Sequence, residues 1–191
     1  GVGTARATLG ACEYGGDKGI FGYGTTASKV SMTNLVSNAG VVGTDVTGVG
    51  TARDGVAACD YGGDKGIFAY GKGSSNVDES NLVSSTGVVG TDVTGVGTAR
   101  TYVVACEYGD DKGIFGLGHI DGTDQSMTNL VSNVGVVSTD VTGVATARHG
   151  AGACSYGYDK GIFAYGYEVG GSAVSMSNLV SNAGVVATDT T

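Results

Sequence analysis

The sequence predicts an all-β fold built from four repeats, on three observations. Short motifs return four times in a fixed order, at intervals of 47 to 49 residues. Gly supplies 37 of the 191 residues, and this disfavours long helices because Gly costs about 1 kcal/mol per helical position. Short apolar runs alternate with turn signals rich in Gly, Asn and Asp, a pattern typical of all-β repeat proteins.

The repeat boundaries follow from the motifs. GVGTAR, or GVATAR in the last copy, opens each repeat, and DKGIF, NLVS and GVV follow in that order. We therefore divide the chain into units 1 to 4 within a single predicted domain, 1–191, and the units span 1–47, 48–94, 95–142 and 143–191.

Each unit is predicted to form four strands, A to D. Gly and Asp between strands A and B tolerate positive φ and supply a turn, and Asn and Gly do the same between C and D. The segment joining B to C changes from unit to unit, and a Gly-rich link leads into the next unit. In unit 1 the predicted strands are 7–14, 19–23, 31–37 and 41–46.

The distribution of side-chain size favours a radial arrangement of these strands. Strand A is small and apolar on both faces, as in LGAC and VAAC, whereas strand B carries Ile, Phe and Tyr. A β-propeller of four four-stranded blades needs this gradient, because blades converge at the axis and diverge outward. The alternative is a β-solenoid, in which each unit would make two rungs.

A family resemblance rests on Arg6, the run Tyr14-Gly15-Gly16 and the segment 18–24. This order of Arg, apolar strand, Gly turn and second strand resembles the kelch repeat, and it covers all four units. The chain is also similar to Gly- and Thr-rich arrays of phage virion and tail-fibre proteins. The resemblance implies a propeller with a binding or structural role and no chemistry. Because kelch rings usually have more than four blades, closure by four blades and closure by several chains or a longer chain both stay open.

Charge excludes some partners. The formal net charge is −8, and nucleic-acid binding requires clustered Lys and Arg. No apolar run approaches the roughly 20 residues of a membrane span. We expect neither nucleic-acid binding nor membrane insertion.

Residues fixed in every unit are interpreted as structural. The four Cys occupy one repeat position, which predicts free thiols that fill the core beside Ala and bind no metal. Glu13, Asp60 and Glu107 share another position, either as a solvated strand end or as a cation site. The repeated arginines either pair with Asp between blades or form an axial ring that binds an anion; they are Arg6, Arg53, Arg100 and Arg148.

The segments between strands B and C, named here the B–C loops, are the predicted binding region, since binding residues concentrate on loops of a rigid scaffold. A weaker alternative is an enzyme using His119, Asp121 and Asp124, although no catalytic motif is present. The candidate binding residues are Lys72, Asn76, Asp78, His119, Asp121, Asp124, Tyr167 and Glu168.

These observations predict a non-enzymatic structural, assembly or recognition module without cofactor or metal. Its expected partners are copies of itself, giving a homo-oligomer or a larger assembly, or other proteins and glycans. A lectin-like module that binds sugars or receptors through the B–C loops is the alternative. The expected location is extracellular or on a virion.

Overall fold

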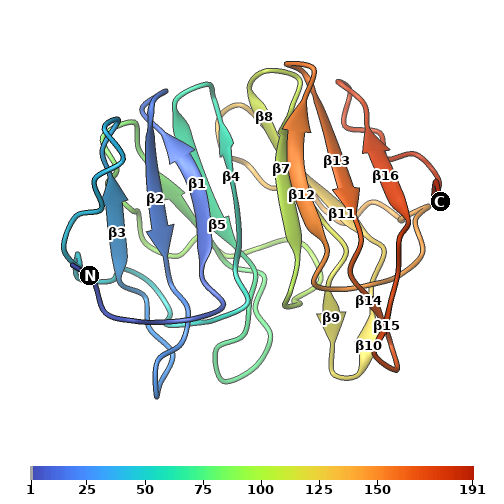
Figure 1. The fold of residues 1–191 in the computed structure, drawn as a ribbon, viewed down its shortest axis with the longest axis horizontal. Helices are drawn as coiled ribbons and strands as arrows, with labels where there is room; N and C mark the ends of the chain where they lie inside the picture. Colours follow the sequence, from blue (N-terminus) through green and yellow to red (C-terminus); the bar gives the residue numbers. More distant parts are fainter. Residues whose placement is uncertain (1) are drawn as a thin grey trace.

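The computed structural model describes residues 2–191, and within them every regular element is a β-strand paired in antiparallel fashion (Figure 1). The prediction of an all-β fold is confirmed. Each unit forms one three-stranded sheet. The sheets are β1 (Gly10–Tyr14), β2 (Lys18–Gly22) and β3 (Thr33–Val36); β4 (Ala57–Tyr61), β5 (Lys65–Ala69) and β6 (Ser80–Val83); β7 (Val104–Tyr108), β8 (Lys112–Gly116) and β11 (Thr128–Val131); and β12 (Gly152–Tyr156), β13 (Lys160–Ala164) and β16 (Ser177–Val180).

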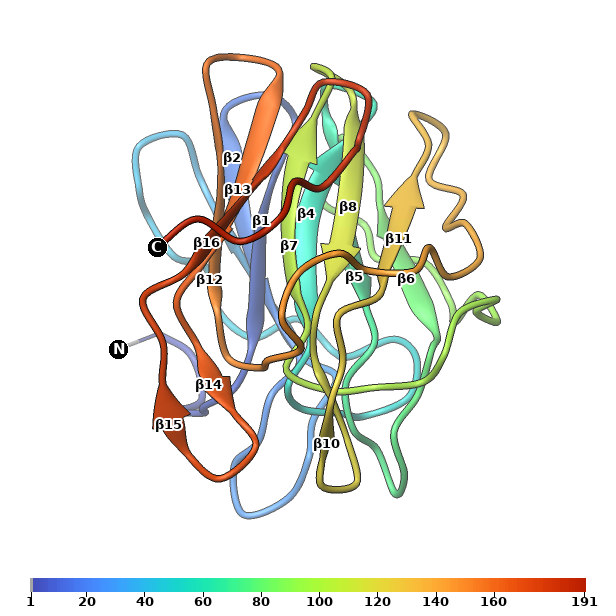
Figure 2. The same ribbon diagram turned by 90° about the vertical axis from the view of Figure 1, so that its right-hand side faces the viewer.

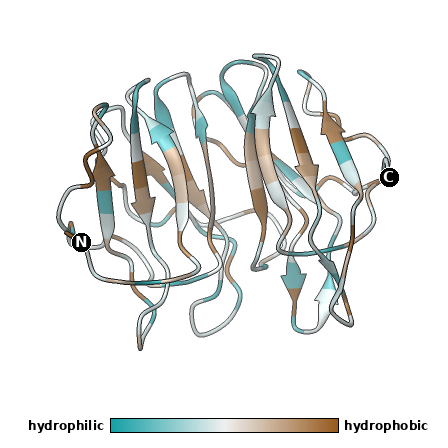
Figure 3. Ribbon diagram, in the orientation of Figure 1, coloured by the Kyte–Doolittle hydropathy of each residue, from teal (hydrophilic) through white to brown (hydrophobic). Residues whose placement is uncertain are grey.

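Two further hairpins extend the B–C loops of units 3 and 4. They are β9 (His119–Ile120) with β10 (Thr123–Asp124), and β14 (Tyr167–Glu168) with β15 (Ser172–Ala173). Both lie at the lower end of the molecule in Figure 1, at the opposite end from the turns between the first two strands of each sheet. Figure 3 shows that hydrophobic residues follow the strands, while the hairpin β9–β10 is largely hydrophilic.

The prediction of a fourth regular strand in each unit is wrong. Residues 41–46 make only two isolated bridges with β3, at Val36–Val42 and Thr33–Val46. Between the bridges the side chain of Asn34 donates hydrogen bonds to the carbonyl of Gly43 and to the carboxylate of Asp45. Because a side chain takes the place of ladder partners there, the segment is an irregular outer edge, and each unit has three regular strands.

The four sheets form an open fan. Strand β1 packs against β4, β4 against β7, and β7 against β12, so the first strand of each sheet is innermost. The outer strands β3 and β16 lie at opposite sides of the molecule in Figure 1, and Figure 2 shows the fan from its side. A closed four-bladed ring is therefore not what the structure shows. The solenoid alternative is wrong for residues 2–191, because every sheet lies within one unit instead of running through successive units.

The core consists of three apolar clusters, and each lies between two neighbouring units. Between units 1 and 2, the ring of Phe68 covers Gly22, where an added Cβ would approach the ring to 2.7 Å. The same ring packs edge-on against Tyr23, with centroids 5.2 Å apart. On the innermost strand of unit 1, the Cys12 sulfur lies against Gly66 of unit 2. The units thus bury their apolar faces only against neighbours, as in quasi-one-dimensional repeat proteins.

Candidate functional site

The B–C loops contact the next unit through one recurring position. The strand register makes Lys29, Asn76 and Asp124 equivalent, since each pairs with the third residue after the second strand of its own unit. Lys29 reaches the next unit, where its Nζ lies 3.2 Å from the Asp54 carboxylate. His149 occupies in unit 4 the place of Asp54 in unit 2, because each pairs with the third residue after the second strand of its own unit.

The contact between units 3 and 4 is built differently. Asp124 at the end of β10 is buried, and its Oδ1 lies 2.8 Å from Nδ1 of His119 on β9. Nδ1 of His149, from unit 4, also lies 2.8 Å from this oxygen. The two imidazole centroids are 5.0 Å apart. A half-buried cluster of two imidazoles on one carboxylate results, and we name it the His–Asp–His cluster.

Hydrogen bonds fix one proton of this cluster. The backbone N–H of Gly122 donates to Nε2 of His119 over 2.9 Å. That nitrogen must therefore be unprotonated, and Nδ1 of His119 carries the hydrogen that it donates to Asp124. The second carboxylate oxygen, Oδ2 of Asp124, is buried and has no hydrogen-bond partner among the described residues.

The predicted binding residues divide into two groups. His119 and Asp124 belong to the cluster, and the ring of Tyr167 lies 6.1 Å from that of His149. Asp121 is instead exposed and lies 4.0 Å from Nζ of Lys72. The structure does not bring Asp78 or Glu168 into the cluster. Asn76 lies at the equivalent contact between units 2 and 3, with its Oδ1 buried and unpartnered.

Sequence reasoning missed His149, which is 25 residues from Asp124 along the chain. A signal was available. At two of the three boundaries the residue after the repeated Arg meets a B–C loop residue of the preceding unit with a complementary side chain: Asp54 faces Lys29, and His149 faces Asp124. Complementary pairs at repeat-related positions indicate contact across the unit boundary.

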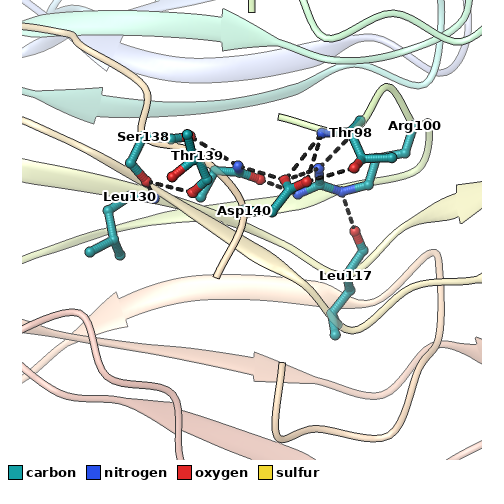
Figure 4. Close-up of polar contacts among 8 residues, drawn as sticks. Thr98, Arg100, Leu117, Leu130, Ser138, Thr139 and Asp140 are labelled. Carbon is teal, nitrogen blue, oxygen red and sulfur yellow. Dashed lines mark hydrogen bonds and ion pairs between the residues drawn. The ribbon is translucent and has the colours of Figure 1, made fainter. Parts of the chain in front are cut away.

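The repeated arginines require a correction: they do not form an axial ring. Arg100 donates to the carbonyls of Leu117 and Thr98 and to the side chain of Asn129, all within unit 3 (Figure 4). Its guanidinium is also 3.9 Å from Asp140 of the same unit, so the Arg–Asp pairs lie within units and not between blades. Units 1, 2 and 4 repeat this arrangement. Since Arg53, Arg100 and Arg148 are fully buried, no anion in solvent reaches them.

The partners of these arginines are ionised. Although burial raises the pKa of Asp140, hydrogen bonds from Thr98 and Asn129 lower it below its usual range. The guanidinium of Arg100 also stacks over the ring of Tyr70, 4.2 Å from its centroid, and so connects unit 3 to unit 2. The repeated Arg therefore organises its own unit and covers a side chain of the preceding one.

The cysteines are free thiols, as predicted. Burial raises the pKa of Cys59 well above its usual value, whereas Cys154 in the last unit is exposed. The acidic residues that follow the first three cysteines differ in burial: Glu13 is exposed, whereas Asp60 and Glu107 are partly buried. Burial, followed by the nearby charge of Asp60, raises the pKa of Glu107 to about 8. The groups of potential metal ligands within residues 2–191 do not include these acids.

No protein-family model and no curated protein sequence matches this chain. The kelch resemblance therefore stays a prediction. Among residues 2–191 there is no helix with the length and apolar character needed to cross a membrane.

Proposed function

We propose that the protein is a non-enzymatic structural module that assembles by stacking the outer face of unit 4 on the outer face of unit 1 of a second copy. The single observation that carries the proposal is that these two outer faces repeat the faces that are buried together at the three internal boundaries. We name the side of a unit that meets the next unit its following face, and the other side its preceding face.

The following face of unit 4 is uncovered. Tyr61 and Tyr108 are 3% and 4% exposed beneath the next unit, whereas the equivalent Tyr156 is 40% exposed. Further out, Tyr70 is 1% exposed and the equivalent Tyr165 is 64% exposed. These aromatic rings supply large apolar areas, and aromatic residues are enriched in the buried centres of protein interfaces.

The preceding face of unit 1 is its complement. Phe68, Phe115 and Phe163 are fully buried against the preceding unit, and the equivalent Phe21 is 38% exposed. At internal boundaries this Phe packs on a Gly of the preceding unit or shares a cluster with its Ala and, in two cases, lies edge-on to its Tyr. Phe21 has the same neighbours available on the unit 4 of another copy, namely Ala164 and Tyr165.

Backbone hydrogen bonds give the boundary a direction. Gly15 N–H donates to the Asp64 carbonyl over 2.7 Å, and Gly24 N–H donates to the Arg53 carbonyl over 2.9 Å. Both bonds recur at the other two boundaries. In these two bonds the following face donates and the preceding face accepts, whereas a third bond runs the other way, from the Gly55 N–H to the Thr8 carbonyl, and also recurs at the other two boundaries. The two faces are therefore different and complementary. In unit 4 the equivalent donors, on Gly157 and Gly166, face no following unit, and association is heterologous, head to tail.

The test uses variants that block one face each. Phe21→Asp places a charge on the preceding face, and Tyr165→Asp places one on the following face. Light scattering coupled to size exclusion is expected to show association of the unaltered protein at about 100 μM, within reach of a micromolar interface. Each variant alone is expected to be monomeric, and an equimolar mixture of the two is expected to form a dimer through the one intact pair of faces.

Tyr158→Gly is the matched control, because it removes an exposed Tyr that lies outside the interface. The copies of this position, Gly16 and Gly63, have no atom within 4 Å of an added Cβ although their units are stacked. A monomeric unaltered protein, or a mixture of the two charged variants that stays monomeric, would overturn the proposal.

A second candidate, glycan recognition, is favoured by a hollow of about 160 Å³ where all four units meet. The segments after the repeated arginines line it, and Tyr102 at its edge offers a half-exposed ring to a sugar face. A glycan array probed with the unaltered protein and with Tyr102→Ala tests this candidate. Binding that Tyr102→Ala abolishes would support it, and an array without binding would dismiss it.

A further inference from the structure

The His–Asp–His cluster contains more ligating atoms than a contact between units requires. Between units 1 and 2 the equivalent contact has one ionised ligand pair: Nζ of Lys29 lies against the Asp54 carboxylate and donates to the carbonyls of Lys72 and Gly73. Between units 3 and 4 the pair Asp124 and His149 is joined by a second imidazole, that of His119. One ligand atom from each of the three residues lies within 4.8 Å of the other two.

The buried carboxylate is incompletely satisfied. The Asp124 side chain is 3% exposed, and both imidazoles lie within hydrogen-bond distance of its Oδ1. Its Oδ2 has no hydrogen-bond partner among residues 2–191. A buried polar atom without a hydrogen-bond partner usually indicates a site of strain, a bound water molecule or a bound ion. The Lys29–Asp54 contact shows that the same place in the fold accommodates a cation next to a carboxylate.

We propose that His119, Asp124 and His149 bind one divalent transition-metal ion, with Zn²⁺ as the best-suited ion. Two imidazole nitrogens and one carboxylate oxygen are a ligand set that Zn²⁺ accepts, and three protein ligands leave one position for water. The imidazoles are 26% and 27% exposed, so an ion has a path from solvent to the nitrogens. The sequence-based expectation of no metal site lacked the contribution of His149.

The ion would change one hydrogen bond. Nδ1 of His119 donates its hydrogen to Asp124 while Nε2 accepts one from Gly122. A metal on Nδ1 takes the lone pair of that nitrogen, so its proton moves to Nε2 through solvent and no net proton is lost from the neutral ring. The N–H of Gly122 then faces another N–H, and the turn at Asp121 and Gly122 has to rotate. Metal binding is therefore coupled to this turn.

The site would lie across a unit boundary, since His119 and Asp124 belong to unit 3 and His149 to unit 4. A bound ion would tie the B–C hairpin of one unit to the following unit and add to the apolar stacking there. Any ligand that binds the folded state and not the unfolded state stabilises the folded protein by mass action. This inference does not depend on self-association, because all three residues lie within one chain.

The experiment is a titration of Zn²⁺, by calorimetry and by competition with a chromophoric chelator. It uses protein carrying Cys154→Ser, because the exposed thiol is a competing ligand. We expect one ion per chain and a rise in the thermal unfolding temperature that EDTA reverses. His149→Ala and His119→Ala are each expected to weaken binding by at least about tenfold. Glu168→Gln, on the B–C hairpin of unit 4 and outside the cluster, is the control and should leave affinity unchanged.

A second readout separates ion coordination from altered folding. NMR is expected to show a shift of the Gly122 amide and of the imidazole nitrogens of both histidines when Zn²⁺ is added. Thermal unfolding in EDTA verifies that each variant is folded before it is titrated. Absence of saturable binding at about 100 μM Zn²⁺, or equal affinity in His149→Ala, overturns the proposal.

Discussion

The internal boundaries and the two outer faces of the fan carry the same kinds of residue in different surroundings. Phe115 is fully buried between units 2 and 3, while Phe21 at the same repeat position is partly exposed. Cys106 is buried and Cys154 is exposed. The repeat therefore encodes a stacking surface on every unit, and whether that surface is core depends only on whether a neighbour is present.

The difference also shows that a unit has little core of its own. The three apolar clusters each draw residues from two units, so the stability of the chain should come mainly from its boundaries. Matched substitutions at an internal copy and an end copy of one position measure how much a boundary contributes.

The largest difference is expected between Phe115→Ala and Phe21→Ala. Removing a fully buried aromatic ring costs about 3–5 kcal/mol, because it combines lost burial with a cavity. No unit within residues 2–191 covers Phe21, which is 38% exposed, so in the monomer its loss should cost less than about 1 kcal/mol. Denaturant unfolding at a concentration that keeps the protein monomeric measures both. Equal losses would mean that the outer face of unit 1 is as buried as an internal boundary.

A smaller difference between an internal copy and an end copy is expected for the Gly that packs against the innermost strand of the preceding unit. An added Cβ at Gly66 would lie 2.5 Å from the sulfur of Cys12 and 3.0 Å from the carbonyl oxygen of Glu13. Overpacking of this kind costs about 1–3 kcal/mol, so Gly66→Ala should lower the free energy of unfolding by that amount.

Gly19→Ala is the control for that substitution. No unit within residues 2–191 stacks on the same position in unit 1, where the atoms nearest to an added Cβ are those of Val36 and the Cys12 carbonyl, at 3.6 Å or more. Its effect should lie within about 0.5 kcal/mol. A loss at Gly19 equal to that at Gly66 would contradict tight stacking of the innermost strands.

The sequence predicted what depends on periodicity and missed what depends on contact between units. The four units, the strands around Cys12 and Ile20, and the free thiols follow from repeated motifs and small side chains. The fourth strand failed because the side chain of Asn34 replaces ladder partners, which strand propensity does not reveal. The axial ring failed because Arg100 finds all its acceptors inside its own unit. His149 was missed because its partner lies in another unit, and only a comparison of equivalent positions in neighbouring repeats relates the two residues.

In the turns between the first two strands of each sheet, a substitution is expected to raise the free energy of unfolding, by about 1 kcal/mol. Units 1 and 2 place Gly at the second turn position, but unit 4 has Tyr158 there at φ +73°. A non-Gly residue in the left-handed region is strained, so Tyr158→Gly should stabilise the protein by about 1 kcal/mol. Asp110→Gly in unit 3, at φ +66°, should gain less, because Asp tolerates this region better. Thermal unfolding of both variants measures the difference, and destabilisation by Tyr158→Gly would show that the exposed ring has a partner.

The smallest effect is expected from the acidic residues at the hub, and it depends on pH. Burial and the charge of Asp60 raise the pKa of Glu107 to about 8, above its unfolded value of about 4.3. Between these values the folded protein binds more protons than the unfolded chain, so this residue's contribution to stability falls as pH rises through that window and is lost above it. Glu107→Gln should flatten the fall and stabilise the protein at pH 9 by less than about 1 kcal/mol, since solvent screens a partly exposed pair.

Glu13→Gln is the end-unit counterpart of that substitution. Glu13 occupies the same repeat position on the exposed outer face of unit 1, with no acid from a preceding unit beside it. The gain at pH 9 should therefore be smaller than for Glu107→Gln. Free energies of unfolding measured from pH 5 to pH 9 for both variants decide the point. If Glu13→Gln flattened the profile as much as Glu107→Gln does, the repulsion would belong to the whole column of acids and not to the internal boundary between units 2 and 3.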